Sequence, residues 1–145
     1  MLLTHGARAP LRPVALAVGN FDGIHRGHQA MLQRLLAGAR QRGLQSCVLT
    51  FEPHPREFFA PHAAPTRLAS LREKLELLAA YGVERTHVQR FDRSFASLAP
   101  EAFVERVLAS TLRAQWLLVG EDFRFGAKRA GDVPLLKSLG GRYGY

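Results

Sequence analysis

Short apolar runs alternate along the chain with longer stretches in which apolar residues recur at helical spacing. The first run is unbroken from Val14 to Val18 and ends at Gly19, which is typical of a strand buried on both faces. Residues 25–42 carry apolar side chains three and four positions apart and precede Gly43, so they predict an amphipathic helix. Further strands are predicted at residues 47–51, 86–91 and 116–119.

Helix-start signals place three more helices between and after these strands. Ser70 and Glu73 form a capping-box pattern that opens one helix. Pro100 stands at the expected first position of another, ahead of an apolar stripe at helical spacing. Asp132 is a cap for a last helix, which we expect to end at the glycine pair 140–141.

This alternation predicts an α/β fold: a Rossmann-like parallel sheet with helices on both faces and right-handed crossovers. The length of 145 residues fits one domain. Ligands of such sheets bind beyond the carboxyl ends of the strands. The loops in question are residues 19–27, 52–65, 92–98 and 120–131. Residues 142–145 resemble the approach to another strand, so we expect a fragment of a longer protein.

The amino-acid composition excludes few classes of function. The formal net charge of +8 comes mainly from 17 Arg against 3 Lys, scattered along the chain. Such a surplus fits a protein that binds nucleotides or nucleic acid, and equally well arginine on solvated faces. Cys47 is the single cysteine, which excludes an intrachain disulfide and a Cys-based metal cluster. Apolar runs of signal-peptide or membrane-spanning length are missing from the sequence, and we expect a cytoplasmic protein.

The loop after the first strand reads Gly-Asn-Phe-Asp-Gly-Ile-His-Arg-Gly-His, residues 19–28. Its glycines let the backbone turn tightly. His25 and His28 are three apart at a helix start, so both can face one side, where free N–H groups and the helix dipole favour phosphate. The loop matches neither the Walker pattern nor the Gly-x-Gly-x-x-Gly fingerprint, and it is a poor zinc site. The plainer interpretation is that the histidines cap a helix.

Residues 19–28 resemble the His-x-Gly-His signature of the nucleotidyltransferase superfamily. In its longer form the segment resembles the adenylyltransferase module of bacterial bifunctional riboflavin kinase/FMN adenylyltransferases, the FAD synthetases. Three more segments agree with that family in order and spacing: Thr-Phe-Glu-Pro-His-Pro at 50–55, Ser-Leu-Arg-Glu-Lys at 70–74, and Val-Gly-Glu-Asp-Phe-Arg-Phe-Gly-Ala-Lys-Arg-Ala-Gly-Asp at 119–132. The resemblance covers nearly the whole chain and implies a sheet of the His-x-Gly-His type.

The resemblance implies that MgATP lies over the first loop, with His25 and His28 as catalytic residues on its phosphates. The FMN phosphate would attack the α-phosphorus, giving FAD and pyrophosphate without a covalent enzyme intermediate. It suggests no protein ligand for Mg²⁺, no nucleic-acid or membrane partner, and no particular oligomeric state. The implied ATP and phosphate contacts are Gly19, Asn20, Phe21, Asp22, Gly23, His25 and His28.

The second loop holds His54 between two prolines that stiffen its backbone. His54 would contact a flavin or nucleotide phosphate. The alternative interpretation is that the segment is only a rigid surface loop. Spacing alone favours the core for Phe58 and Phe59, whereas the resemblance places Phe59 at the flavin.

The fourth loop mixes aromatic and cationic residues. Phe125 would stack on the isoalloxazine ring, Arg124 would neutralise phosphate, and Asp122 would accept a hydrogen bond; Phe123 is expected in the core. The same mixture of phenylalanine and arginine would also suit the stacking of nucleic-acid bases. For the third loop, residues 92–98, we expect only a solvated turn with a helix cap. The implied flavin contacts are His54, Pro55, Phe59, Asp122, Arg124 and Phe125.

The family module continues with a further strand and a Ser-Ser-Thr-x-x-Arg segment that helps to hold ATP, followed by a riboflavin kinase domain. Neither occurs in these 145 residues. We therefore expect weak or no adenylylation by the chain itself, and no kinase activity. Two alternatives remain: a nucleotidyltransferase for another phosphorylated substrate, and a non-catalytic nucleic-acid-binding domain.

Overall fold

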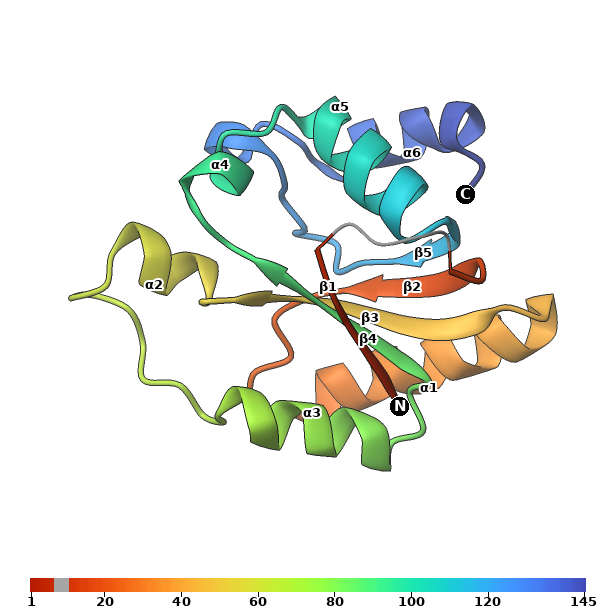
Figure 1. Cartoon of the computed structure of the whole chain (residues 1–145), viewed down its shortest axis with the longest axis horizontal. Helices are drawn as coiled ribbons and strands as arrows, with labels where there is room; N and C mark the ends of the chain where they lie inside the picture. The colour runs from red at the N-terminus through yellow and green to blue at the C-terminus, as the bar shows by residue number, and fades with distance from the viewer. Residues whose placement is uncertain (7–10) are drawn as a thin grey trace.

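The fold is built on one five-stranded sheet, as a computed structural model describing residues 1–6 and 11–145 shows. Every pair of neighbouring strands is parallel, and their order is β1-β4-β3-β2-β5 (Figure 1). This confirms the predicted α/β class. The strands are β1 Leu2–His5, β2 Val14–Val18, β3 Gln45–Glu52, β4 Arg85–Arg90 and β5 Ala114–Leu118.

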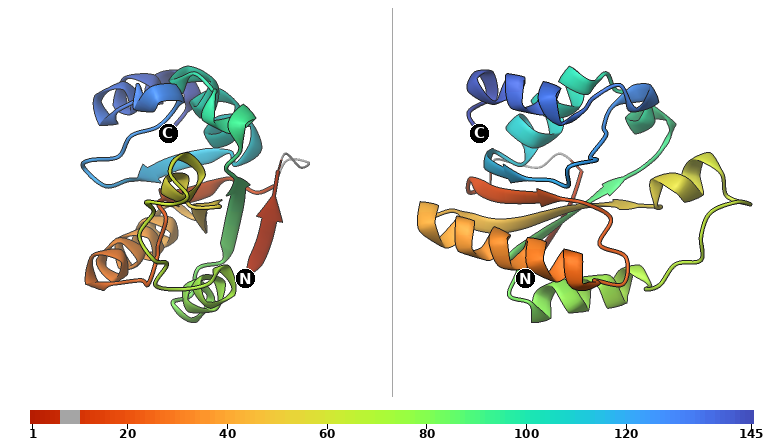
Figure 2. Two further views of the ribbon diagram at one scale, coloured as in Figure 1. Left: turned by 90° about the vertical axis from the view of Figure 1, so that its left-hand side faces the viewer. Right: turned by 180° about the vertical axis from the view of Figure 1, so that it is seen from behind.

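Helices cover both faces of the sheet (Figures 1 and 2). On one face lie α1 (Arg26–Arg42) and α3 (Leu71–Ala80); on the other lie α5 (Pro100–Phe103), its π-helical continuation η1 (Val104–Thr111) and α6 (Val133–Tyr143). The short elements are α2 Pro55–Phe59, α4 Arg93–Ala96 and the 3-10 turn η2 Ala127–Arg129.

The core consists of two apolar layers, one on each face of the sheet. Side chains alternate along β2, so Leu16 packs with Leu49 and Leu108 on the side of η1. Ala15 and Ala17 face the other way and pack with Leu35 of α1. Because β2 is fully buried on both faces, its unbroken apolar run is explained.

The capping signals in the sequence are confirmed. Ser70 Oγ accepts from the Glu73 backbone N–H at 3.2 Å, and the Glu73 carboxylate accepts from the Ser70 N–H at 2.7 Å. Asp132 caps α6 by accepting from Leu135 N at 2.9 Å, and Asp92 caps α4 in the third loop. The amino ends of these helices were therefore predictable from local chemistry.

The sequence did not predict one strand, and it misplaced the end of the last helix. A fifth strand, β1, pairs with β4, although its four residues gave no strand signal and all but Thr4 are exposed. The glycine pair 140–141 does not end α6, which runs on to Tyr143 and ends at Gly144 with φ +84°. Gly140 is instead buried against Tyr145, because a Cβ there would lie 2.9 Å from that residue's carbonyl oxygen.

The helix that begins at Pro100 changes hydrogen-bond pattern after Phe103. Leu112 N donates to the carbonyl of Val107, five residues back, at 3.0 Å. Thr111 Oγ1 donates to the carbonyl of Arg106 at 2.8 Å, also five residues back. A π-helical stretch of this kind leaves the apolar stripe almost unchanged, so the sequence predicts the helix and not its widened turns.

A polar pair from β4 is buried in the sheet near the edge strand. His87 is 0% exposed and its Nδ1 lies 2.9 Å from Thr4 Oγ1 of β1. Arg85, two residues earlier, is 1% exposed. Burial, assisted by the Arg85 charge, lowers the pKa of His87 to about 4 from an ordinary value of 6.5.

We expect this histidine to make folding sensitive to mild acid. As pH falls from 6.5 to about 4, unfolded chains bind a proton on His87 that the folded protein does not bind. Stability present above pH 6.5 is therefore lost across that window, by about 3 kcal/mol. Denaturant unfolding at pH 7 and 4.5 checks this: His87→Leu should lose less stability between the two pH values than the unsubstituted chain. Equal losses would contradict the prediction.

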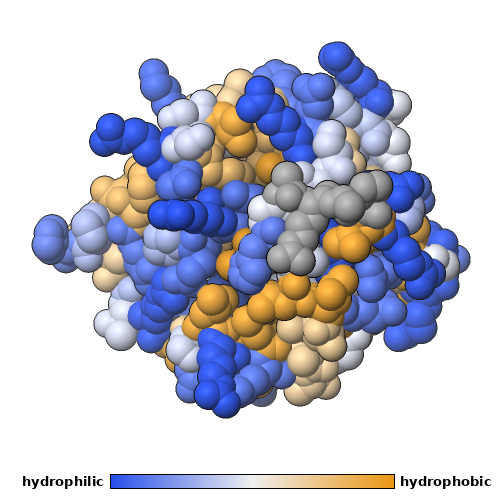
Figure 3. Space-filling view, viewed as in Figure 1, coloured by the Kyte–Doolittle hydropathy of each residue, from blue (hydrophilic) through white to orange (hydrophobic). Residues whose placement is uncertain are grey.

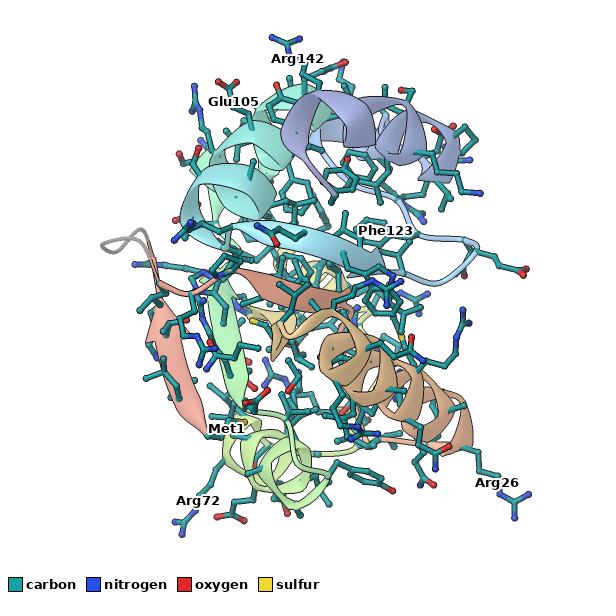
Figure 4. All side chains as sticks on the ribbon, turned by 90° about the vertical axis from the view of Figure 1, so that its right-hand side faces the viewer. Met1, Arg26, Arg72, Glu105, Phe123 and Arg142 are labelled. Atoms are coloured by element: carbon teal, nitrogen blue, oxygen red, sulfur yellow. The ribbon has the colours of Figure 1, made fainter. Side chains whose placement is uncertain are left out.

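On the face shown in Figure 3, apolar residues gather in patches among mostly hydrophilic ones. Met1, Leu2 and Leu3 at the edge strand are 46%, 45% and 39% exposed. Arg26, Arg72, Glu105 and Arg142 point outward from the helices (Figure 4). In the described ranges we find no helix that is both long and apolar enough to span a membrane.

Candidate functional site

The unusual loops meet at the carboxyl edge of the sheet, which faces the viewer in the left panel of Figure 2. β2 lies between β3 and β5, so the chain leaves β2 and β5 at the point where the strand order reverses. In open parallel sheets this is where ligands bind. The first and fourth loops follow these two strands, and the second loop follows β3.

The two histidines of the first loop lie against each other at the start of α1. His25 is the N-cap residue, and its Nδ1 accepts from His28 N over a long 3.4 Å. The imidazole rings are stacked with centroids 3.7 Å apart and planes inclined by 17°. The prediction that both face one side is confirmed, and the capping interpretation also holds. Because a single side chain caps it, the helix end keeps free N–H donors.

Two glycines give this loop its shape. Gly23 has φ +72°, and a Cβ there would lie 2.9 Å from the Leu68 side chain. At Gly27 a Cβ would lie 3.1 Å from the His25 ring, so a larger residue would displace that imidazole. Phe21, implied as a phosphate contact, has its ring buried at 1% exposure, 5.2 Å from the His28 ring. It supports the loop from below.

The pKa of His28 is lowered from its ordinary value. Burial is the main cause that lowers its pKa, followed by the neighbouring His25 and, more weakly, Lys74; Asp22 opposes them. Its Nδ1 is buried and lacks a hydrogen-bond partner within the described protein. The Asn20 Oδ1 atom is in the same condition. A bound polyanion would oppose the effect of burial, because negative charge favours the imidazolium form.

Asp22 contacts protein rather than open solvent. Its carboxylate accepts from the backbone N–H groups of Leu68 at 3.1 Å and Ala69 at 3.0 Å. Both donors belong to the segment that leads into α3. The residue implied as a phosphate contact therefore ties the first loop to the segment just before α3 in this structure.

The second loop contains α2, where the sequence predicted irregular backbone. His54 is its N-cap residue and its Nδ1 accepts from Arg56 N at 3.0 Å. Burial lowers the pKa of His54, with Glu57 opposing and Lys74 and Arg56 adding to the effect. Pro55 is the first residue of α2, so its missing N–H costs nothing there.

A shallow cavity of about 180 Å³ lies between the first and second loops. Asp22 and His54 reach it from the two loops, and Arg67 closes one side. Arg67 bridges Glu52, with one hydrogen bond of 3.1 Å, and Glu57, whose carboxylate it also contacts. The full lining is Asp22, His54, Arg56, Glu57, Ala64, Pro65 and Arg67.

A run of phenylalanine rings connects the second loop with the fourth. Phe59 is 66% exposed and lies 5.7 Å from Phe91, so the spacing-based expectation of a core position was wrong. From Phe91 the ring contacts continue at 5.4 to 5.9 Å through α4 and α5 to the fourth loop. The rings in order are Phe59, Phe91, Phe95, Phe103, Phe125 and Phe123.

In the fourth loop, Phe125 is the buried phenylalanine and Phe123 the more exposed one, the reverse of what the sequence predicted. Phe125 is 6% exposed, packed between Phe103 and Phe123 and paired through its backbone with Gly131. Phe123, expected in the core, is the more exposed ring, and Figure 4 shows it beside the end of β5. Of the two rings, Phe123 is therefore the more accessible from the solvent. Asp122 and Arg124 are exposed.

Sequence reasoning missed Lys74 of α3, which is 5% exposed beneath the first two loops. Its signal was present: Lys74 lies four residues before Leu78, on the buried stripe of an amphipathic helix. Arg67 and its two glutamates were also missed, and nothing in their spacing indicated an ion-pair network.

The donor groups at this edge do not form a ready metal cage. Across residues 1–6 and 11–145 we find no three His, Cys, Asp or Glu side chains placed to share one metal ion. A divalent cation would therefore need ligands from a bound molecule as well as from the protein.

The chain resembles known proteins along nearly its whole length. The family model described as FAD synthetase matches residues 7–145. The bifunctional riboflavin kinase/FMN adenylyltransferase of Escherichia coli K12 is 49% identical over 139 residues, which are 96% of this chain and 44% of that protein. The Pseudomonas fluorescens protein of the same name is 44% identical, covering 97% of this chain and 45% of that protein. The chain spans less than half the length of these relatives.

A solved structure has a closely similar fold. The Streptococcus pneumoniae protein described as a macrolide-efflux protein superimposes with a TM-score of 0.77 at 25% identity, over 95% of this chain and 47% of that one. Together with the parallel sheet and the histidine pair at its carboxyl edge, the match over residues 7–145 places this chain in the FAD synthetase family.

Proposed function

We propose that this chain transfers AMP from ATP to FMN, giving FAD and pyrophosphate, as part of a longer protein that also phosphorylates riboflavin. The observation that carries the proposal is the stacked His25–His28 pair at the free amino end of α1, at the switch point of the sheet. We place the activity in the cytoplasm.

In the proposed reaction the triphosphate of ATP lies over residues 19–28. The N–H groups at the start of α1 and the two imidazoles donate hydrogen bonds to phosphate oxygens. These bonds strengthen as the FMN phosphate oxygen forms a bond to the α-phosphorus and the bond to the pyrophosphate oxygen breaks. Fixed donors lower the barrier because they need no reorganisation when charge develops.

We propose that FMN lies along the second and fourth loops. The exposed ring of Phe59 offers a stacking surface, and Phe123 offers a second one at the other end of the phenylalanine run. Of the donor groups in these loops, we propose His54 and Arg124 for the FMN phosphate. Asp122 is placed on the exposed fourth loop to accept a hydrogen bond from a polar ligand edge.

The magnesium ion is proposed to be carried by the phosphate oxygens of ATP, because the described residues lack a three-ligand group. When bound, it would neutralise charge on the phosphates. The groups proposed to position ATP and FMN are the two histidines, the start of α1 and the loops.

The test is a titration of FMN with the purified chain, following quenching of flavin fluorescence with and without MgATP. Saturable quenching that an oligonucleotide does not compete away supports the flavin site. Phe59→Ala should raise the Kd for FMN about 2- to 10-fold, because one stacking partner is lost. Leu2→Ala, an apolar truncation at an exposed position of the edge strand, should leave it unchanged.

Other outcomes point to the two alternatives. Quenching that falls steeply with salt and is abolished by the oligonucleotide favours a nucleic-acid-binding domain. A response to MgATP without any response to FMN favours a nucleotidyltransferase for another phosphorylated substrate.

A further inference from the structure

Lys74 is a buried cation that the proposed reaction does not yet use. It lies on α3 with 5% exposure, and its Nζ donates to Thr50 Oγ1 at 3.2 Å. Among the described residues it forms no ion pair, because the neighbouring Glu52 is held by Arg67. Burying an ammonium group with one neutral partner is costly, and a methionine would fill the same space without that cost.

The hydrogen bonds of Lys74 lead directly to the first loop. Thr50, at the carboxyl end of β3, accepts from Lys74 and donates its own hydroxyl hydrogen to the Asn20 carbonyl at 3.1 Å. Asn20 is the second residue after β2. One side chain of α3 thus joins the ends of two adjacent strands just before their loops diverge.

The same ammonium group faces the second loop. It lines a small hollow together with Asp22 and His54, beside the larger cavity between the loops. Its positive charge acts on His28 from below one loop and on His54 from below the other. The charged groups around Lys74 itself are Glu52, Arg67, Asp22 and Glu57.

We propose that Lys74 is a positioning residue of this site: through Thr50 and Asn20 it fixes the first loop relative to the second, and its ammonium group faces both loops from beneath. The inference deepens the proposed adenylyl transfer, on which its catalytic meaning rests. The contacts of Lys74 exist in the ligand-free chain, so its positioning role can be tested without measuring turnover.

The direction of the charge effect follows from the neighbours of each histidine. Burial is the first cause that lowers the pKa of both, and Lys74 adds to it in both cases. For His28 the other charged groups are His25 and Asp22; for His54 they are Glu57, Arg56 and Asp22. Removal of the ammonium should therefore raise both pKa values.

The test is an NMR titration of the histidine rings in the full chain. Lys74→Met should raise the pKa of His28 and His54 together, while Lys74→Arg should leave both low. Lys137→Met, which removes the same charge from an exposed position on α6, is the matched control and should change neither. Unchanged pKa values in a folded Lys74→Met protein would overturn the proposal.

Two further variants keep the proposal open to refutation. Lys74→Gln removes the charge and keeps a donor for Thr50, so it should raise both pKa values with less loss of stability. If neither neutral variant folds, Thr50→Val decides, since it breaks the link to Asn20 and leaves the charge: the ring resonances of His28 should move, and an unchanged spectrum would overturn the positioning role.

A second readout separates this proposal from the proposed function. In the FMN titration, Lys74→Met should abolish the effect of MgATP that the unsubstituted chain shows. If the unsubstituted chain responds to neither FMN nor MgATP, the proposed function fails for this chain, and the histidine titration still decides the role of Lys74.

Discussion

In a chain extended to the length of its relatives, His28→Ala is expected to slow FAD formation by about 10²- to 10³-fold, the usual effect of removing one fixed donor from a transition state. The His28 ring is stacked on His25 and supported by Phe21, so it is held in place before substrate binds. The measurement is FAD formed from FMN and MgATP, accompanied by the MgATP effect on FMN fluorescence. The second readout reports the nucleotide site even where turnover is slow.

The matched control is His62→Ala. His62 is an exposed histidine of the second loop that does not line the cavity between the loops, so its removal costs the same imidazole without touching the pair. We expect His62→Ala to keep the rate and the nucleotide response. Equal losses in both variants would show that histidine content, and not the pair at α1, is what matters, and the proposed placement of ATP would be refuted.

The layered architecture was predictable because it depends on local signals. The buried strand Val14–Val18, the Ser70–Glu73 capping box and the Asp132 cap each carry their information within a few residues. The histidine pair was predictable for the same reason, since a spacing of three at a helix start fixes one common side.

The features that escaped prediction depend on distant partners. Strand β1 exists because β4 offers it an edge, and Gly140 lies inside a helix because Tyr145 folds back onto it. The burial of Phe125 and the exposure of Phe59 follow from the ring contacts that connect loops some 60 residues apart in sequence. Neither propensity nor spacing contains that information.

Lys74 is an intermediate case. A charged residue on the buried stripe of α3 contradicts the local pattern, and such conflicts concentrate at functional sites. The sequence thus indicated that Lys74 needs an explanation, while only the fold supplies Thr50 and Asn20 as its partners.

The fourth loop should be disabled by the smallest possible substitution, Gly126→Ala. Gly126 has φ +77°, and a Cβ there would lie 2.8 Å from the backbone N and Cα of Pro100. With ψ 176° this backbone lies in a region used almost only by glycine, which alone costs alanine roughly 1–3 kcal/mol. Because Pro100 begins α5, relief of the clash requires the loop or the helix to move. The free energy of unfolding should fall by more than that backbone cost, and the affinity for FMN should fall with it.

Gly141→Ala is the control of opposite sign. Gly141 lies inside α6, and a Cβ there meets nothing within 4 Å. Alanine in a helix interior is favoured over glycine by roughly 0.5–1 kcal/mol, so this variant should unfold at a higher denaturant concentration than the unsubstituted chain. The two substitutions add the same single carbon atom. If both shifted stability in the same direction, the contact between the fourth loop and the start of α5 would not be the constraint that holds this side of the site in place.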